Sequence, residues 1–348
     1  MKLHALTLAL VLASGACKKK ASEPAPEVTS GSGSAGSGSA GSGSAGSGSA
    51  AGPTEAERVA TAMKKLEEET ATEAARWTDD FKKKAIELRD RPYKDIKEAL
   101  TAVLASDHRT PPHRDRDSAR HPLETLTFFG LAPTMTVVEV GAGDGWYTEI
   151  LAPVLANKGK LVVAGADANG PADKMSTVYG KRLDLFLAKS PDLYGKVERL
   201  TIKPDALSFG ADGSADLVIA IREMHNWQRR NELDKYLTAI FAALKDGGTF
   251  GLVAHRAKEG TQGEATAESG YLAEQWVIDK VTAKGFIVVE KSEINANPKD
   301  TKDYEKGVWT LPPNYRLGET DKAKYAAIGE SDRMTIKFQK PVKAGETK

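Results

Sequence analysis

Hydrophobic and polar residues follow two different rhythms along the chain, and the rhythm changes near residue 121. Before that point apolar residues recur at intervals of three and four, which predicts one or two amphipathic helices over 54–91 and a shorter one over 96–104. Thr54 and Glu57 have the spacing of a capping box, so the folded part is expected to begin there. The apolar faces of these helices can pack on the rest of the chain or on a coiled-coil partner.

After residue 121 the pattern alternates between strands and helices. A short helix comes first, with Pro122 in its first turn and Gly130 after it. The strand candidates are residues 135–140, 160–166, 197–202, 215–221, 248–254, 285–292 and 333–339. The helical candidates between them are residues 146–157, 171–189, 230–245 and 269–284. Such alternation predicts right-handed crossovers and an α/β fold, a doubly wound and mainly parallel sheet covered on both faces.

Composition indicates the general class of protein and bears on nucleic-acid and membrane-surface partners. The chain has 348 residues, of which 40% are apolar and 28% charged, so most of it is expected to fold as a soluble globule of one or two domains. Lys and Arg number 49 against 48 for Asp and Glu. No charge excess indicates a nucleic-acid or membrane-surface partner, so neither is expected.

The first residues have the features of an export signal. A mostly apolar run over 3–16 follows Lys2, ends in small residues and is shorter than the about 20 residues that span a bilayer. Cys17, the only cysteine, resembles the lipid-bearing cysteine of a bacterial lipoprotein, although Ser14 stands where such signals usually have Leu. The chain is therefore expected to be exported and anchored through Cys17, facing the periplasm or exterior. Ordinary cleavage after Ala16 and an uncleaved apolar helix are the alternatives.

A low-complexity segment separates this signal from the folded part. GSGSA is repeated four times over 31–50, a composition that cannot bury enough surface to fold and that predicts a flexible tether. A repeat without a selected length is the alternative. The chain then divides into a signal peptide with its cysteine (1–17), a linker (18–53), a helical extension with a connecting segment (54–120), an α/β domain (121–340) and a tail (341–348).

The stretch VVEVGAGDGWYTEI, residues 137–150, holds the clearest candidate for ligand binding. Gly141, Gly143 and Gly145 follow the first predicted strand and open a helix, and glycines there permit positive φ and close backbone approach. Their spacing is one residue shorter than the dinucleotide fingerprint. Glu139 precedes them, and an acid at this point suits a cationic cofactor better than a pyrophosphate.

This motif resembles the first motif of class I S-adenosylmethionine-dependent methyltransferases, and the likeness continues over about 121–340. KLVVAGAD, KPDALSF, LKDGGTFGLV and SDRMTIKFQKP follow in the family's order. The resemblance implies a seven-stranded, Rossmann-like sheet with an antiparallel last strand and S-adenosylmethionine as cofactor. It further implies that Asp167 grips the ribose hydroxyls and that Asp205 bonds the adenine amino group. The implied cofactor-binding residues are Glu139, Gly141, Gly143, Gly145, Asp167 and Asp205.

A second resemblance is to a group of predicted methyltransferases that often carry export signals. RHPLETLTFFG precedes the first strand, HNW follows the fourth, and NPKDTKDYEKGVWTLPP and GESDRM come near the end. The substrate of that group is not established, so this resemblance implies a fold and a cofactor but no particular reaction.

Two residues are candidates for chemistry, because methyl transfer requires alignment and a base only where the acceptor must lose a proton. His225 comes just past the fourth predicted strand, and an imidazole with an ordinary pKa of ~6.5 suits proton abstraction. Alternatively, His225 and Asn226 bond the backbone into the next helix. Tyr147 can lie over the cofactor or serve as a core aromatic residue.

The stretch HRTPPHRDRDSARH, residues 108–121, concentrates histidine and arginine. Its spacings match no familiar zinc pattern, so no metal is expected. Arg114, Arg116 and Arg120 can form a basic lid over the cofactor mouth, and a solvated connection is the alternative. In the tail of the domain, Trp309, Arg316 and Arg333 can cap a substrate pocket.

Two classes of function fit these features. The leading hypothesis is an enzyme that transfers a methyl group from S-adenosylmethionine to a small-molecule acceptor. The rival is an exported, lipid-tethered binding module that keeps the cofactor cleft without turnover, and another reaction on the same fold, such as aminopropyl transfer, is a third possibility. The export signal argues against the enzyme, because this cofactor is made and kept in the cytoplasm.

Overall fold

The computed structural model describes residues 54–263 and 266–342, all within one compact unit. The predicted signal peptide, Cys17 and the Gly/Ser linker lie outside the described residues, as does most of the predicted tail. Among the helices of the described residues, none is long and apolar enough to cross a membrane.

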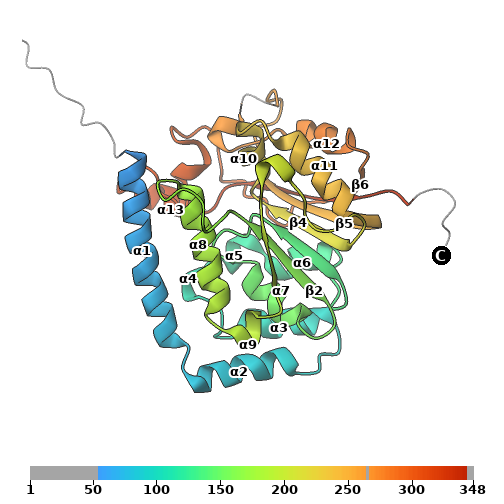
Figure 1. Ribbon diagram of the computed structural model, residues 1–348. Helices are drawn as coiled ribbons and strands as arrows, with labels where there is room; N and C mark the ends of the chain where they lie inside the picture. Colours follow the sequence, from blue (N-terminus) through green and yellow to red (C-terminus); the bar gives the residue numbers. More distant parts are fainter. Residues whose placement is uncertain (1–53, 264–265, 343–348) are drawn as a thin grey trace, which may run out of the picture. The chain divides into compact units, whose positions relative to one another are not determined.

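Seven strands form one sheet in the order β3-β2-β1-β4-β5-β7-β6 (Figure 1). The strands are β1 (Thr136–Val140), β2 (Lys160–Gly165), β3 (Glu198–Thr201), β4 (Ala215–Ile221), β5 (Leu244–His255), β6 (Ile287–Ser292) and β7 (Arg333–Gln339). β1 to β5 pair in parallel, and β7 runs antiparallel to both β5 and β6. This is the Rossmann-like class I methyltransferase fold, so the predicted fold class and its antiparallel last strand are confirmed.

Helices cover both faces of the sheet because successive residues of each strand point to opposite sides. Val138 and Val140 of β1 face the core that α11 (Leu233–Ala243) and α12 (Glu274–Thr282) complete. Val137 faces the other core, with α3 (Ile96–Ala105), α7 (Thr148–Leu155) and α8 (Met175–Ala188). The doubly wound arrangement predicted from the alternation of strands and helices is thus confirmed.

Several predicted boundaries are wrong. The helix expected over 230–245 ends at Ala243, because Leu244 already belongs to β5 and pairs with Ala215 of β4. The strand expected over 248–254 accordingly begins earlier, at Leu244, and the helices expected over 171–189 and 269–284 begin later, at Met175 and Glu274. The remaining predicted strands coincide with the observed ones to within two residues at each end.

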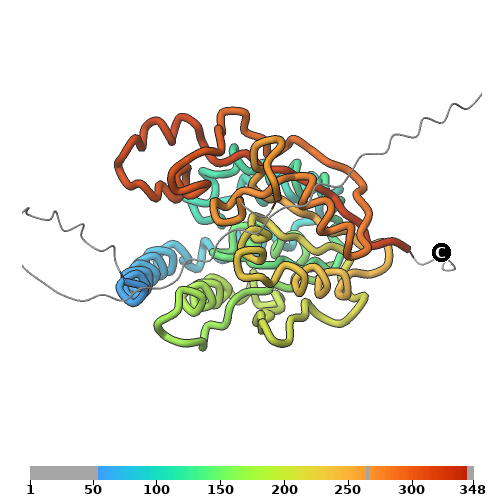
Figure 2. Tube along the Cα trace, turned by 90° about the horizontal axis from the view of Figure 1, so that it is seen from above, coloured from blue at the N-terminus to red at the C-terminus, as the bar shows by residue number. Residues whose placement is uncertain are grey.

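The N-terminal helices pack on the sheet domain. α1 (Glu55–Arg76) begins with the predicted capping box, in which the Glu57 amide donates to Thr54 Oγ1 at 3.3 Å and the Thr54 amide to Glu57 Oε2 at 2.7 Å. α1 lies beside α8, as both views show (Figures 1 and 2), and Val59 and Leu66 of α1 are buried there. α2 (Asp79–Asp90) then turns the chain toward α3. The apolar face of α1 is therefore covered within the chain.

Short helices complete the connections between these elements. They are α4 (Pro111–Arg114), α5 (Asp117–Arg120), α6 (Pro122–Phe128), α9 (Pro191–Tyr194), α10 (Met224–Arg229) and α13 (Lys322–Ile328). Three single turns of 3-10 helix are η1 (Pro204–Ala206), η2 (Ala267–Ser269) and η3 (Gly307–Thr310). α6 has Pro122 in its first turn, as predicted, and Gly130 follows it with a φ of +81°.

Candidate functional site

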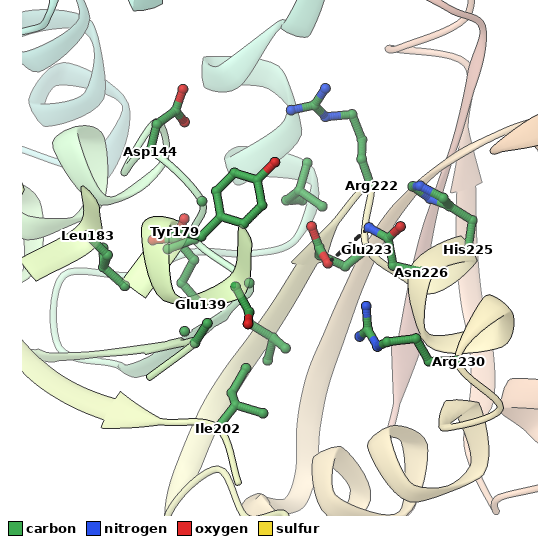
Figure 3. Close-up of a pocket in the computed structure, with 18 of the residues that line it drawn as sticks. Glu139, Asp144, Tyr179, Leu183, Ile202, Arg222, Glu223, His225, Asn226 and Arg230 are labelled. Carbon is green, nitrogen blue, oxygen red and sulfur yellow. Dashed lines mark hydrogen bonds between the residues drawn. The ribbon is translucent and has the colours of Figure 1, made fainter. Parts of the chain in front are cut away.

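A cavity of about 1150 Å³ opens at the carboxyl ends of the parallel strands (Figure 3). Its wall includes the residues that directly follow β1, β2, β3 and β4, and residues 308–316 between β6 and β7 close another side. β1 and β4 are neighbours although they are not consecutive in the chain, so the strand order reverses between them. Ligands of doubly wound sheets bind at such a reversal.

The glycine turn forms one wall of this cavity, with φ values of +73°, +59° and +82° at Gly141, Gly143 and Gly145. Side chains rarely adopt this left-handed conformation. A Cβ at Gly141 would lie 2.6 Å from Glu223 Cγ, whereas a Cβ at Gly143 would meet no atom within 4 Å. Backbone at Gly143 is therefore open to close approach by a ligand.

Glu139 lies at the end of β1 and is buried in the cavity wall. Its Oε2 accepts a hydrogen bond of 2.7 Å from Thr148 Oγ1 at the start of α7. Burial raises the pKa of Glu139 to about 7, although the bond from Thr148 opposes the shift. A carboxyl group whose pKa lies near neutral pH readily ionises when a cation binds beside it.

Asp167 and Asp205 are exposed and line the same cavity, Asp167 on the loop after β2 and Asp205 in η1 after β3. Asp167 Oδ1 accepts a 2.8 Å hydrogen bond from the Asn169 amide, which fixes the loop. Gly180 of α8 packs directly beneath this loop, since a Cβ there would lie 2.5 Å from Ala168 N. The structure thus brings five of the six predicted cofactor-binding residues to one cavity, and their roles stay predictions. Gly145 does not line the cavity: it packs against Phe186, whose ring would lie 2.8 Å from a Cβ at this position.

His225 lies in α10 with 4% of its surface exposed, and its ring faces the cavity. The ring centroid is 5.4 Å from that of His255 and 5.8 Å from that of Trp309. Burial, aided by the positive charge of Arg222, lowers the pKa of His225 to about 3. The imidazole is therefore neutral at physiological pH, and its pKa lies well below the ordinary value expected from the sequence.

Tyr147 also faces the cavity and is buried at the start of α7. Its ring packs edge-on against Trp146, with the centroids 4.6 Å apart. Burial raises the pKa of the phenol above its usual range, so Tyr147 stays protonated. Tyr147 is therefore both a buried aromatic residue of the core and part of the cavity wall, the two alternatives that the sequence offered.

Residues that the sequence did not single out complete the site. Glu223 follows β4, packs over the glycine turn and receives a 3.4 Å hydrogen bond from Asn226 Nδ2. Burial raises the pKa of Glu223 to about 7. Arg222 and Glu330 also face the cavity, as does Arg120, one of the arginines that the sequence suggested for a basic lid. A single charged residue after a strand matches no sequence motif. Residues such as Glu223 and Arg222 can therefore be assigned to the site only once the fold is known.

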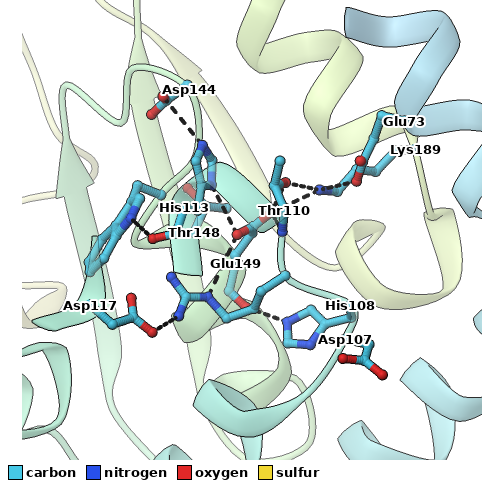
Figure 4. A network of polar contacts seen from close by, with 12 residues as sticks. Glu73, Asp107, His108, Thr110, His113, Asp117, Asp144, Thr148, Glu149 and Lys189 are labelled. Carbon is cyan, nitrogen blue, oxygen red and sulfur yellow. Dashed lines mark hydrogen bonds and ion pairs between the residues drawn. The ribbon is translucent and has the colours of Figure 1, made fainter. Parts of the chain in front are cut away.

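The interpretation of residues 108–121 as a solvated connection holds for only part of the stretch, because His108, Arg109, His113 and Arg120 are buried whereas Arg114 and Asp115 are exposed. Glu149 of α7 draws the segment inward: it accepts hydrogen bonds from the Thr110 amide at 2.9 Å, His113 Nδ1 at 3.0 Å and Lys189 Nζ at 3.0 Å (Figure 4). Arg109 Nε lies 3.7 Å from the same carboxylate. Among the described residues no group of metal ligands converges there or elsewhere.

His113 connects this network to the glycine turn (Figure 4). Its Nε2 lies 3.3 Å from Asp144 Oδ2, while its Nδ1 bonds Glu149. Burial opposes a charge here, but the two carboxylates prevail and raise the pKa of His113 to about 9. The charged imidazole of His113 thus connects the glycine turn to α7.

In the C-terminal segment, Trp309 and Arg316 face the cavity as predicted, whereas Arg333 is buried and does not line the cavity.

Comparison with known proteins yields structural neighbours only. No family model matches the chain, and no curated protein sequence matches it. A SAM-dependent methyltransferase from Aquifex aeolicus is 17% identical, covering 69% of this chain and 98% of its own, with a TM-score of 0.44. The cyclase SpnF is 16% identical, covering 65% and 81%, with a TM-score of 0.44. Phosphoethanolamine N-methyltransferase 2 from Haemonchus contortus, in complex with S-adenosyl-L-methionine, is 18% identical, covering 64% and 52%, with a TM-score of 0.42.

Proposed function

We propose that the chain binds S-adenosylmethionine in this cavity and transfers its methyl group to a small-molecule acceptor. One observation carries the proposal: Glu139, the left-handed glycine turn, Asp167 and Asp205 come from the ends of three strands and meet around one cavity. The size of the cavity supports a cofactor together with a small acceptor.

The residues present fit this cofactor. Backbone at Gly143 is open to a ligand, and Asp167 offers a carboxylate to the ribose hydroxyls. Asp205 lines the same cavity, and the resemblance implies that its carboxylate would accept a hydrogen bond from the adenine amino group. Glu139 and Glu223 flank the turn with carboxyl groups that favour a positive charge once ionised. When bound, the cofactor supplies a methyl group on a positively charged sulfonium.

The acceptor end of the cavity is formed by aromatic and histidine side chains. His225, His255 and Trp309 lie against one another there, and Ser331 Oγ lies 2.6 Å from His255 Nδ1. These groups exclude water and orient an acceptor. His225 is neutral and so able to receive a proton from a nucleophile that ionises easily.

A role in binding without turnover is favoured by the burial of His225, which lowers the pKa of its imidazole. An imidazole with a pKa of about 3 holds a proton weakly, so it suits an acceptor that loses no proton, or no transfer at all. Formation of S-adenosylhomocysteine in the presence of an acceptor would indicate methyl transfer, and its absence would indicate binding without turnover.

We further propose, on the sequence features alone, that the chain is exported and tethered through Cys17.

The affinity for S-adenosylmethionine is predicted to depend on pH. Glu139 and Glu223 have pKa values of about 7 and are protonated below it, whereas a cation prefers their ionised forms. Affinity should therefore fall by about tenfold between pH 8 and pH 6 for each acid that must ionise. Calorimetric titration of the full chain at both pH values measures this change.

Two controls sharpen this titration. Glu223→Gln removes one of the two acids and should reduce the pH dependence, and S-adenosylhomocysteine, which lacks the sulfonium charge, should show less dependence than S-adenosylmethionine. Lack of binding by either ligand at both pH values would refute the proposed function. Binding without pH dependence would refute the role given to the two acids.

A further inference from the structure

Four arginines surround one carboxylate beside the cavity. Arg116 Nε lies 2.7 Å from Glu330 Oε1, and Arg120 Nε and Arg333 Nη1 lie 3.2 Å and 2.9 Å from Oε2. Arg222 is close enough for its charge to lower the pKa of Glu330, yet it makes no ion pair within residues 54–263 and 266–342. We call Arg116, Arg120, Arg222 and Arg333 the arginine cluster.

Each member of the cluster has a buried nitrogen without a hydrogen-bond partner among the described residues. These atoms are Arg116 Nη2, Arg120 Nη2, Arg222 Nε and Arg333 Nε. Arg120 is only 3% exposed and Arg333 likewise, so bulk water does not compensate them. Buried donors of charged groups are costly when unpaired, and four in one place indicate that an acceptor is missing.

The neighbouring acids do not balance this charge. Asp144 is within reach of Arg116 and Arg222, but it already bonds His113, whose pKa is raised to about 9. Glu223 is within reach of Arg222, but burial raises the pKa of Glu223 to about 7, so this acid is only partly ionised near neutral pH. Glu330 alone is shared among three guanidinium groups. The cluster therefore keeps a net positive charge in a buried position, which favours an anion.

The cluster faces the acceptor end of the cavity. Arg120, Arg222 and Glu330 belong to the cavity wall, together with His225 and Ser331. Arg222 directly follows β4, and Figure 3 shows its side chain extending away from Arg230, on the side where Asp144 lies. An anion bound there would lie beside the residues that we assign to the acceptor.

The backbone at Arg222 supports a role in binding. Its φ is +63°, a left-handed conformation that is unfavourable for an arginine, and its amide donates a 2.7 Å hydrogen bond to the Val253 carbonyl. The side chain forms no ion pair among the described residues to offset this strain. A strained residue that holds an unpaired charge toward a cavity is a feature of functional sites.

We propose that the arginine cluster binds a carboxylate or phosphate group of the methyl acceptor, with Arg120 and Arg222 making the contact. Guanidinium groups present paired donors that match the oxygens of both anions. This inference rests on the proposed function and assigns the class of acceptor, a small molecule that carries an oxyanion. The carboxylate of S-adenosylmethionine is an alternative ligand for the arginine cluster. The test below distinguishes an anion of the acceptor from the carboxylate of the cofactor.

The test titrates inorganic phosphate, and separately acetate, into the full chain saturated with S-adenosylhomocysteine. At least one of the two anions should bind, and Arg222→Met should weaken this binding by about tenfold or more. Arg222→Lys keeps the charge and should lose less. Arg58→Met, which alters an exposed arginine of α1, should change nothing. The affinity for S-adenosylhomocysteine should be the same in all four proteins, and the thermal midpoint of Arg222→Met should not fall, since no ion pair is removed.

Three results separate this inference from the proposed function. Absence of anion binding, with S-adenosylhomocysteine still bound, would overturn the inference alone. A loss of affinity for S-adenosylhomocysteine in Arg222→Met would also overturn it, because the cluster would then hold the carboxylate of the cofactor. Binding of phosphate or acetate by a chain that binds neither cofactor form would support the anion site and refute the proposed function.

Discussion

Replacing Glu149 with alanine is expected to destabilise the folded chain by about 3–5 kcal/mol, the usual result of removing one partner from a buried ionic network. Glu149 is fully buried and accepts hydrogen bonds from Thr110, His113 and Lys189, with Arg109 nearby. Its loss leaves three buried cations without their shared counter-charge. The same change frees the segment that holds the glycine turn through His113.

Urea unfolding of the full chain, followed by circular dichroism, measures this free energy. Glu67→Ala is the matched control, because Glu67 is an exposed glutamate on α1 and its loss should change stability by less than about 0.5 kcal/mol. A loss below about 1 kcal/mol for Glu149→Ala would contradict the account of the network.

The network also sets a pH window. The pKa of Glu149 is held well below its ordinary value of 4.5, so its contribution to stability is present above that value and is lost as the pH falls. The pKa of His113 is raised to about 9, so its contribution is present below pH 6.5 and is lost as the pH rises through 9.

The second large effect is expected from Gly180→Ala, although Gly180 does not face the cavity. A Cβ at this position would lie 2.5 Å from backbone atoms of Asp167 and Ala168, which cannot turn aside as a side chain can. The loop that carries Asp167 must move away from α8. We expect the affinity for S-adenosylmethionine to fall by about ten- to hundredfold, in line with the usual cost of overpacking.

Calorimetric titration measures this affinity in the full chain. Gly213→Ala is the control, because Gly213 lies outside the cavity and a methyl group there would meet no atom within 4 Å. The φ of +64° at Gly213 would still strain the backbone of an alanine. It should reduce stability and leave the affinity unchanged. An unaltered affinity in Gly180→Ala would show that the position of the Asp167 loop does not determine binding.

Local patterns in the sequence predicted the sheet and one side of the site. Each strand has its own apolar run, and the motif around Gly143 carries its own chemistry, so neither depends on distant residues. The resemblance then placed Asp167 and Asp205, which the fold brings to the same cavity.

The other side of the site depends on contacts that no local pattern contains. Arg116 and Glu330 are 214 residues apart in the chain, and Thr110 and Glu149 are 39 apart. Arginine and histidine are usually exposed, so the stretch over 108–121 predicted a solvated segment until the fold supplied buried acids. The low pKa of His225 has the same origin, since burial is a property of the folded chain.

The most direct test of the central claim is a crystal structure of the full chain grown with S-adenosylmethionine. We expect a cofactor whose adenosyl group lies between the glycine turn and the carboxylates of Asp167 and Asp205, with its methyl group toward His225. A cavity that stays empty at saturating cofactor, or a cofactor bound away from the glycine turn, would contradict the account.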